Sequence, residues 1–504
     1  MDEKDVIVIG AGIAGLSAGC YAAMNGLKTE IHEMHTHPGG LCTSWKRGGY
    51  TFDYCIHWLV GSSPKSDFHK IWSDLGIMRE RTFIDHEVFV AVENPDGRIF
   101  TLYTDPDKLQ AHMKALFPAD AKAVAGMCAD IRRFSEFDMI IDPAFDLRTI
   151  GKFLGELPAF ARMVKLAPLG AREYAERFSD PWLREIITNI FGMPEMPIFS
   201  LFMTLAWMHA GTAGYPIGGS LPMARAAEAR FKELGGEIRY GSKVERVLVR
   251  DGKAVGVRLS DGTERYARYV VSAADAHATF KNFLADEYRD PVFERYFEEK
   301  ALFPSLVQIS LGVDRSFEGV AQTCTWKLAE PLLVDDGENG KPNTVRQLSL
   351  HHYGYDPTMA PKGKTALLVR LNGTPAFWRD LAKSDRPRYE AEKARVLSAV
   401  TKALDEKFPG LAERVEVSDV STPWTCERYT GNWEGCMEGW KMTKSAMAET
   451  MSGKGLPATI AGLSNFRLAG QWLSPGGGLP PSANSGREAV KAICKAEGRR
   501  FRSS

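Results

Sequence analysis

The sequence of 504 residues has no net charge, because 63 lysines and arginines balance 63 aspartates and glutamates. It has no basic run that could follow a phosphate backbone, so we expect no nucleic-acid partner. It also lacks an apolar run of the ~18 residues that a transmembrane helix needs. The charged start, Met1–Asp5, leaves no room for a signal peptide before the first expected strand. These absences predict a cytoplasmic protein whose membrane contact, if any, is peripheral.

Metal and disulfide signals are absent as well. The eight cysteines are scattered, and no C-x-x-C pair occurs. We therefore expect neither a zinc site nor a dithiol redox motif, but buried free thiols. His351 and His352 are adjacent, yet neighbours in a strand point to opposite faces, so we expect no metal there.

The chain has a single G-x-G-x-x-G motif, formed by Gly10, Gly12 and Gly15. The apolar run Val6–Ile9 predicts a buried parallel strand before it, and a helix is expected over Ala14–Met24. Gly10 allows a tight turn, Gly12 leaves room for a pyrophosphate, and Gly15 lets the helix pack on the strand. The helix N-terminus would offer N–H groups to phosphates.

An acidic residue follows the motif at the expected distance. A second strand over residues 28–33 ends on Glu33, whose carboxylate can accept hydrogen bonds from both ribose hydroxyls and would repel a 2′-phosphate. Strand, glycine turn, helix and acid together predict a dinucleotide site. The glycine pair Gly39 and Gly40 comes soon after and is expected to line the same nucleotide.

The same kind of pattern returns in the middle and at the end of the chain. Glycine turns, a helix over 223–234 and strands at 237–240, 244–250, 254–259 and 269–274 are expected. Near the C-terminus we expect a strand at 466–470, a loop at 471–481 and a helix over 484–496. We therefore predict a discontinuous nucleotide-binding domain over 1–62, 215–299 and 456–504.

The remaining segments, 63–214 and 300–455, should form a second domain. Helices are expected at 67–75, 107–117 and 388–408, a hairpin at 88–104, and strands at 306–313 and 365–371. Residues 142–211 are mostly helical in pattern and unusually apolar. They predict a helical core or, alternatively, a lid over an apolar tunnel or a patch that meets a bilayer.

The absence of a second glycine motif argues against a separate nicotinamide domain and for one tightly held dinucleotide. A fold in which the N-terminal and C-terminal segments of the chain bind the same cofactor suits the long FAD molecule. The N-terminal loop would hold the adenosine diphosphate. The Gly476–Gly478 loop and the last helix would face the second phosphate, the ribityl chain and the polar edge of the flavin.

Through most of its length the chain resembles the phytoene desaturase, carotenoid isomerase and retinol saturase branch of the FAD-dependent amine-oxidase-like superfamily. The motifs that carry the resemblance are spread over both ends and the middle. They are Val6–Glu33, Pro38–Gly40, Gly49–His57, Pro216–Gly219 with Val244, Val270–Asp275, Thr422–Gly431, Leu468–Trp472, Pro475–Gly478 and Ser485–Gly486.

The resemblance implies an α/β fold: a Rossmann-like FAD-binding domain of the GR2 type, with a three-layer ββα architecture, and an interleaved α+β substrate domain. It implies that the adenine ribose binds Glu33, the pyrophosphate binds Gly12–Gly15 and the adenine lies against Val244. The expected cofactor-binding residues are Gly10, Gly12, Ile13, Ala14, Gly15, Glu33, Gly39, Gly40, Leu41, Val244, Ala273, Gly470, Gln471, Gly477, Gly478 and Leu479.

Three positions depart from the pattern of relatives. Leu41 stands where many have an arginine for the phosphates, and Arg47 is a candidate to replace it. Gln471 stands where many have an aspartate that binds ribityl hydroxyls. Cys55 stands where relatives often have glycine, which would alter the pocket beside the flavin.

The chemistry needs few protein groups, since the flavin performs the hydride step and the protein supplies orientation and a dry pocket. Of the residues expected near the flavin, His57 is the first candidate proton donor and Tyr54 the second. A structural role for His57 is the alternative. Trp58, Trp433 and Trp472 are expected to pack in the core or to line an isoprenoid slot.

We therefore expect an FAD-dependent oxidoreductase that desaturates or saturates carbon–carbon double bonds of a long apolar polyene, isoprenoid or lipid. A quinone, oxygen or a transient nicotinamide would exchange electrons with it. The alternatives are a flavin amine oxidase, a polyene cis–trans isomerase that uses reduced FAD without net redox, and a non-enzymatic prenyl-lipid escort. The intact Gly10, Gly12, Gly15 and Glu33 argue against the escort.

Overall fold

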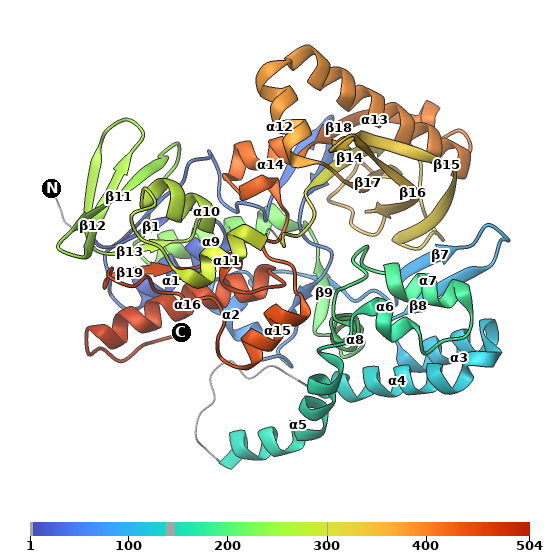
Figure 1. Ribbon diagram of the computed structural model, residues 1–504, viewed down its shortest axis with the longest axis horizontal. Coiled ribbons are helices and arrows are strands. Elements are labelled where there is room, and N and C mark those ends of the chain that lie inside the picture. The colour runs from blue at the N-terminus through green and yellow to red at the C-terminus, as the bar shows by residue number, and fades with distance from the viewer. Residues whose placement is uncertain (1–3, 138–146, 300, 504) are drawn as a thin grey trace.

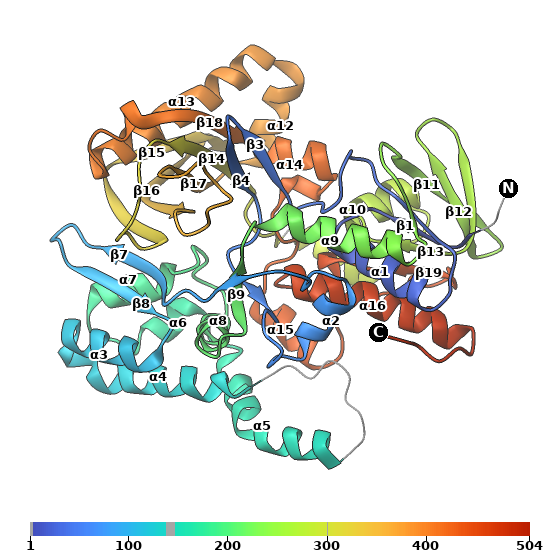
Figure 2. The ribbon, with the colours of Figure 1, turned by 180° about the vertical axis from the view of Figure 1, so that it is seen from behind.

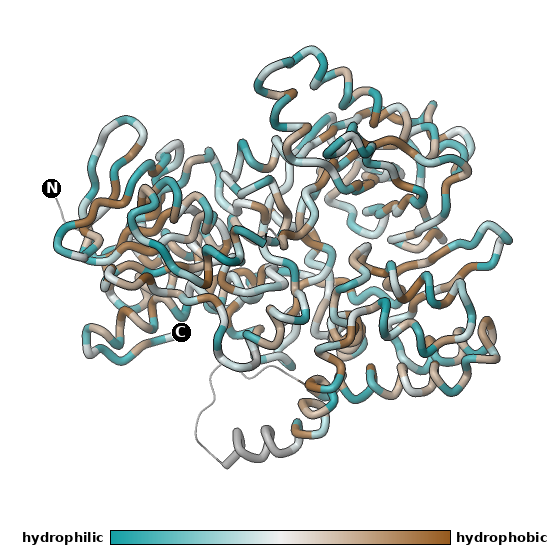
Figure 3. The backbone as a smooth tube through the Cα atoms, viewed as in Figure 1, coloured by the Kyte–Doolittle hydropathy of each residue, from teal (hydrophilic) through white to brown (hydrophobic). Residues whose placement is uncertain are grey.

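The computed structural model describes residues 4–137, 147–299 and 301–503, without the side chains of residues 147–154 and Met451. Two β-sheets lie on opposite sides of the molecule, and a group of helices lies beside the second sheet (Figure 1). Hydrophobic segments are concentrated in the interior strands of both sheets (Figure 3). Within the described residues, no helix has both the length and the apolarity to cross a bilayer.

Parallel strands form the centre of the first sheet, in the order β10, β2, β1, β13 and β19. In β1, Val6 and Val8 pack with helices α1, α9 and α16, whereas Ile7 and Ile9 pack with strands β11 and β12. This alternation gives a three-layer ββα arrangement, because successive side chains of a strand point to opposite faces. The bounds are β1 Lys4–Ile9, α1 Ile13–Met24, β2 Thr29–His32, α9 Ser220–Glu233, β10 Glu237–Arg239, β11 Val244–Arg250, β12 Lys253–Leu259, β13 Glu264–Ser272, β19 Phe466–Leu468 and α16 Leu479–Ala496.

The last helix begins earlier than the sequence predicts. Helix α16 starts at Leu479 rather than Asn484, with Pro480 and Pro481 in its first turn. Proline is tolerated there because the first N–H groups of a helix have no intrahelical partner. The expected loop therefore ends at Gly478, and helix α16 lies directly against α1, as Figures 1 and 2 both show.

The second sheet joins the two segments assigned to the second domain. Its order is β18, β14, β17, β16, β15, β7 and β8, and β7 from the first segment runs parallel to β15 from the second. Helices α12 and α13 contribute to the apolar core of this sheet. The division of the chain into two domains stays a prediction. The bounds are β7 Val88–Glu93, β8 Ile99–Tyr103, β14 Leu306–Val313, β15 Thr323–Glu338, β16 Lys341–His352, β17 Thr365–Asn372, α12 Pro375–Ser384, α13 Arg386–Lys407 and β18 Val415–Ser421.

A third core lies among the helices that follow the β7–β8 hairpin. The helices are α3 Pro106–Leu116, α4 Ala121–Ser135, α5 Leu147–Leu166, α6 Ala171–Ala175, α7 Pro181–Asn189 and α8 Ile198–His209. Helix α3 corresponds to the helix expected at 107–117, helix α4 was not predicted, and helices α5 to α8 fall in the apolar segment 142–211, whose first residues, 142–146, lie outside the described part of the chain. The smaller elements are β3 Ser44–Arg47, β4 Tyr50–Asp53, β5 Leu59–Val60, α2 Phe68–Asp74, β6 Phe83–Ile84, β9 Ala213–Pro216, α10 Ala276–Ala278, α11 Pro291–Glu299, α14 Pro423–Thr430 and α15 Lys444–Met451.

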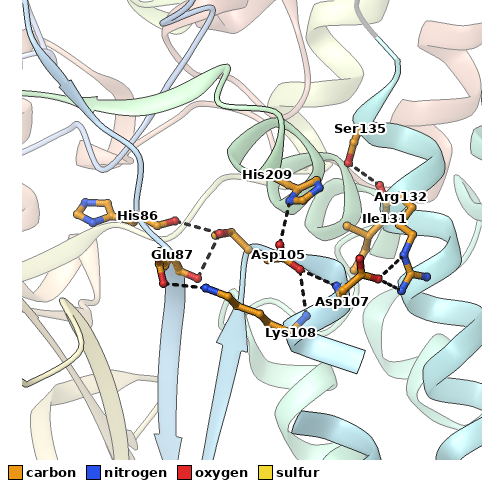
Figure 4. A network of polar contacts seen from close by, with 10 residues as sticks. His86, Glu87, Asp105, Asp107, Lys108, Ile131, Arg132, Ser135 and His209 are labelled. Carbon is orange, nitrogen blue, oxygen red and sulfur yellow. Dashed lines mark hydrogen bonds and ion pairs between the residues drawn. The ribbon is translucent and has the colours of Figure 1, made fainter. Parts of the chain in front are cut away.

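A polar network ties the hairpin to these helices (Figure 4). The Asp105 carboxylate caps helix α3 by accepting hydrogen bonds from the N–H groups of Asp107 and Lys108, at 2.8 and 3.0 Å. Lys108 reaches Glu87 on the hairpin, and Arg132 of α4 donates to Asp107. The N-cap aspartate and first-turn proline that start α3 are thus local sequence features that also fix its place.

Candidate functional site

A cavity of ≈ 970 Å³ opens at the carboxyl ends of the parallel strands. The residues that follow β1, β2, β13 and β19 all line it, since parallel strands end at one edge of the sheet. Ligands bind at this edge in open α/β sheets. Of the site residues that the sequence predicts, the cavity is lined by Gly10, Gly12, Ile13, Ala14, Glu33, Gly39, Gly40, Leu41, Tyr54, Val244, Ala273, Gly470, Gln471 and Leu479.

The glycines of the motif differ in what they do. Gly10 has a φ of +95°, which glycine adopts without strain. At Gly12, an added Cβ would meet only the Gly39 carbonyl oxygen, at 3.9 Å, so the space in front of it is open. At Gly15, an added Cβ would lie 1.9 Å from the Gly10 oxygen. Gly15 is therefore a packing residue and does not line the cavity.

The start of helix α1 presents backbone donors to this space. Its N-cap is Gly12, and no side chain caps the first turn. The unpaired N–H groups and the positive end of the helix dipole suit an anionic group such as a pyrophosphate.

Glu33 is held in place at the end of β2. Its carboxylate accepts hydrogen bonds from the backbone N–H groups of Ala11, at 2.6 Å, and His35, at 2.8 Å. Burial raises the pKa of Glu33, and these hydrogen bonds oppose the rise. Each carboxylate oxygen has a further lone pair that can accept from a hydroxyl. The carboxylate is thus oriented and still able to bind a ribose.

Cations lie around the same cavity even though Leu41 supplies none. Arg47 lines it, paired through Nε with Asp419 at 3.0 Å. The other basic residues that line the cavity are Lys243, Lys383, Arg386, Lys393 and Arg428. Their charges favour a ligand that carries phosphates.

The two ends of the chain meet behind the cavity. The Ser17 hydroxyl of α1 donates to the Ala483 carbonyl of α16, at 2.6 Å. At Gly486, an added Cβ would lie 2.3 Å from the Ala14 oxygen, so the two helices are in backbone contact. Gly478 is the N-cap of α16, with a φ of +95°. Gly477 and Gly478 themselves do not line the cavity, although Leu479 and Ser482 do.

The sequence pattern of a single family spans nearly all of these elements. Residues 13–494 match the family described as flavin containing amine oxidoreductase. The chain belongs to this family. It is therefore an FAD-dependent oxidoreductase, with the Rossmann-like α/β fold that the sequence predicts.

Curated relatives of this flavoprotein are similar to it over most of its length. It is 26% identical to the chloroplastic prolycopene isomerase of Arabidopsis thaliana, over 96% of this chain and 81% of that protein. It is 28% identical to the neurosporene-forming phytoene desaturase of Rhodobacter capsulatus, over 84% of this chain and 82% of that protein. Among solved structures, an oxidoreductase from Methanosarcina mazei has the same fold, with a TM-score of 0.60, 17% identity, and 97% and 100% of the two chains covered.

The cavity residues fit FAD. The open space at Gly12, the uncapped N-terminus of α1, the oriented Glu33 carboxylate and the surrounding cations are what a dinucleotide requires. Bound FAD supplies hydride transfer, and the chain supplies binding, orientation and exclusion of water. Of the sixteen cofactor-binding residues predicted from the sequence, all but Gly15, Gly477 and Gly478 line this cavity, and those that line it stay the proposed contacts.

A buried carboxyl group that the sequence analysis did not single out lies in the flavoprotein's cavity. Asp275 follows β13 and accepts hydrogen bonds from the backbone N–H groups of Ala278, at 2.7 Å, and Trp433, at 2.8 Å. Burial raises its pKa to about 7, which these hydrogen bonds oppose. An aspartate directly before a short helix is an N-cap signal, but only the fold places it in the cavity.

The two predicted proton donors lie in different surroundings. Tyr54 lines the cavity, and its hydroxyl has no hydrogen-bond partner among the described residues. Burial raises its pKa well above the usual value, so it holds its proton.

His57 does not line the cavity and does not cap a helix. Its Nε2 lies 2.8 Å from Nη1 of Arg370 on β17. Since a guanidinium only donates, Nε2 accepts and the proton is on Nδ1. Burial, then the positive charges of Arg370 and His86, lower the pKa of His57 well below its usual value. His57 is therefore a neutral imidazole, and its role as a proton donor stays a prediction.

Proposed function

We propose that this flavoprotein acts on carbon–carbon double bonds of a long apolar polyene or isoprenoid substrate. The main support is its similarity, over 96% of the chain, to a protein named prolycopene isomerase, together with its similarity to a phytoene desaturase. Desaturation or saturation is the primary hypothesis. Isomerisation without net redox is the alternative, and the similarity to prolycopene isomerase favours it.

The groups beside the FAD cavity are compatible with a substrate that has no charge. Tyr54 and Trp472 are buried and line the cavity, and Trp433 stacks on His277 with ring centroids 4.5 Å apart. Tyr54 and His57 are neutral for the reasons given above. Aromatic surfaces exclude water and provide contact area for a polyene beside the place where FAD would be held.

The test is anaerobic absorbance spectroscopy of the FAD-loaded protein with polyenes, isoprenoid lipids and amines. We expect polyenes or isoprenoids to bleach the oxidised flavin, or to reoxidise the photoreduced flavin, while amines do neither. Turnover of a cis-polyene to its trans form, with no net change in flavin absorbance, would establish the isomerase instead. Bleaching by amines alone would overturn the proposal in favour of an amine oxidase.

We also propose that helix α5 brings the protein to the lipid surface from which such a substrate would come. Leu157, Phe160 and Val164 are 42%, 44% and 42% exposed and lie on one helical face. Figures 1 and 2 show α5 extending from the body of the molecule, and Figure 3 shows hydrophobic segments in its C-terminal half.

Replacing all three residues with serine should weaken binding to lipid vesicles by about 100-fold, because each lost side chain contributes ~1 kcal/mol when it is partly buried. Flotation with phosphatidylcholine vesicles measures this. Ile99→Ser is the control, since Ile99 is 50% exposed but lies on β8. Equal flotation of the triple variant and the wild type would rule out α5 as the contact.

A further inference from the structure

Two cysteines that belong to no C-x-x-C motif meet beside the FAD cavity. Cys42 lines the cavity and is buried, whereas Cys55 is partly exposed. Both are free thiols, and their side chains are hydrogen-bonded to each other. The fold thus creates a dithiol that the spacing of the cysteines in the sequence does not predict.

The pairing of β3 with β4 explains why the two cysteines meet. Ser44 lies opposite Asp53 in this antiparallel pairing, and one position further on the Tyr54 N–H donates to the Thr43 carbonyl at 3.0 Å. The next position in the same register places the two cysteines opposite each other. Residues that face each other across antiparallel strands have Cβ atoms about 4.5–5.5 Å apart, close to the ~3.5–4.5 Å that a disulfide needs. A small movement would therefore let the two sulfurs bond.

Hydrogen bonds to one serine hold both cysteines in place. The Cys42 N–H donates to the Gly39 carbonyl at 3.0 Å, and the Cys42 thiol donates to the Ser220 carbonyl at 3.4 Å. The Cys55 N–H donates to the Asp53 carboxylate at 2.9 Å, and this carboxylate also accepts from the N–H and the hydroxyl of Ser220, each at 2.7 Å. Both cysteines are therefore anchored to the start of helix α9.

The two thiols differ in how readily a reagent can attack them. The hydrogen bond with Cys55, and then burial, raise the pKa of the Cys42 thiol well above its usual range. Since the thiolate is the reactive form, Cys42 is a poor first target for an oxidant in solution. Cys55 is the sulfur that a small oxidant can reach, and Cys42 lies next to it as the partner that completes a disulfide.

We infer that Cys42 and Cys55 form a reversible disulfide, with a small hydroperoxide as the oxidant and a dithiol as the reductant. The Cys55 sulfur attacks a peroxide oxygen, the O–O bond breaks, and a sulfenic acid and one water form. The Cys42 sulfur then displaces the hydroxyl group from the Cys55 sulfur, and the S–S bond forms. The Cys42 proton leaves with the hydroxide as a second water. A dithiol reverses the change by giving up two electrons and two protons, and becomes a disulfide itself.

The disulfide would join two segments that both line the FAD cavity. Residues 41–45 line it from one side of the β3–β4 hairpin, and Tyr54 lines it from the other. A covalent link between Cys42 and Cys55 would prevent these segments from separating. Because FAD can leave only when the cavity opens, we expect the oxidised protein to release FAD more slowly than the reduced protein.

Peptide mapping of the FAD-loaded protein tests for the disulfide. After treatment with hydrogen peroxide and alkylation of the remaining thiols, we expect a peptide pair linked through Cys42 and Cys55, which dithiothreitol separates. Cys55→Ser should form no such pair, and Cys42→Ser should leave Cys55 to be trapped as a sulfenic acid by dimedone. Cys324→Ser is the matched control, because Cys324 is also partly exposed but lies on β15, and it should form the pair as the wild type does.

The rate of FAD release, followed by flavin fluorescence, is the second readout. Peroxide treatment should lengthen the half-time of release in the wild type and in Cys324→Ser, but not in Cys55→Ser. If Cys55 is oxidised to a sulfinic acid while Cys42 stays free, the disulfide is ruled out. A cross-linked protein that loses FAD as fast as the reduced protein would overturn the role of the link in holding the cofactor.

Discussion

Gly12→Val should abolish FAD retention. The added side chain would project into the open space before the N-terminus of α1, where the nearest protein atom to a Cβ is the Gly39 oxygen at 3.9 Å. The protein itself tolerates a Cβ there, so the clash falls on the pyrophosphate rather than on the fold. We expect FAD affinity to fall by at least about 100-fold, equivalent to ~2.7 kcal/mol, measured by flavin fluorescence after gel filtration and by titration of the apoprotein.

Gly126→Val is the matched control for this variant. Gly126 lies in helix α4, and an added Cβ there meets nothing within 4 Å. The control should retain full flavin content. Wild-type occupancy in Gly12→Val would mean that the pyrophosphate binds elsewhere and that the N-terminal motif does not form the cofactor site.

Gly486→Ala should destabilise the protein more than any other substitution that adds one methyl group at the contact between helices α1 and α16. Its Cβ would lie 2.3 Å from the Ala14 oxygen and 2.8 Å from the Ala18 nitrogen, both of them backbone atoms of α1 that cannot move aside as a side chain can. Separating the two helices would open the core that contains Ala18, Val490 and Ile493. We expect the free energy of unfolding to fall by about 3 kcal/mol, measured by urea denaturation.

The same variant should bind FAD more weakly, because Ala14 lines the cavity. Gly126→Ala serves as the control and should be neutral or slightly stabilising, since alanine is favoured over glycine in a helix. A Gly486→Ala variant with wild-type stability would show that α1 and α16 are not in close contact.

The sequence by itself was sufficient to predict the local structure at the start of the chain, where the cofactor site is proposed. The run Val6–Ile9, the three glycines, helix α1 and Glu33 are governed by local rules: side-chain periodicity, the steric freedom of glycine and the distance between a strand end and the next strand. The same local rules located strand β14, strand β17 and the hairpin of β7 and β8 within a few residues. The start of α16 was missed because Pro480 and Pro481 resemble a loop unless they occupy a first helical turn.

Other features depended on residues far apart in the chain. Sequence analysis did not identify the long hairpin of β15 and β16, because its pairing is decided by packing against β17 and β7. Arg370 lies 313 residues from His57, and nothing local to either predicts a hydrogen bond that keeps the imidazole neutral. The raised pKa of Asp275 arises from burial, which only the assembled layers create.

The sequence by itself thus predicted the phosphate-binding turn proposed for the cofactor, since such a turn is a short-range structure whose steric requirements are set by neighbouring residues. The acid–base environment beside it was decided by the tertiary structure. Desolvation and charge–charge interactions depend on which segments surround a group, and those segments come from every part of the chain.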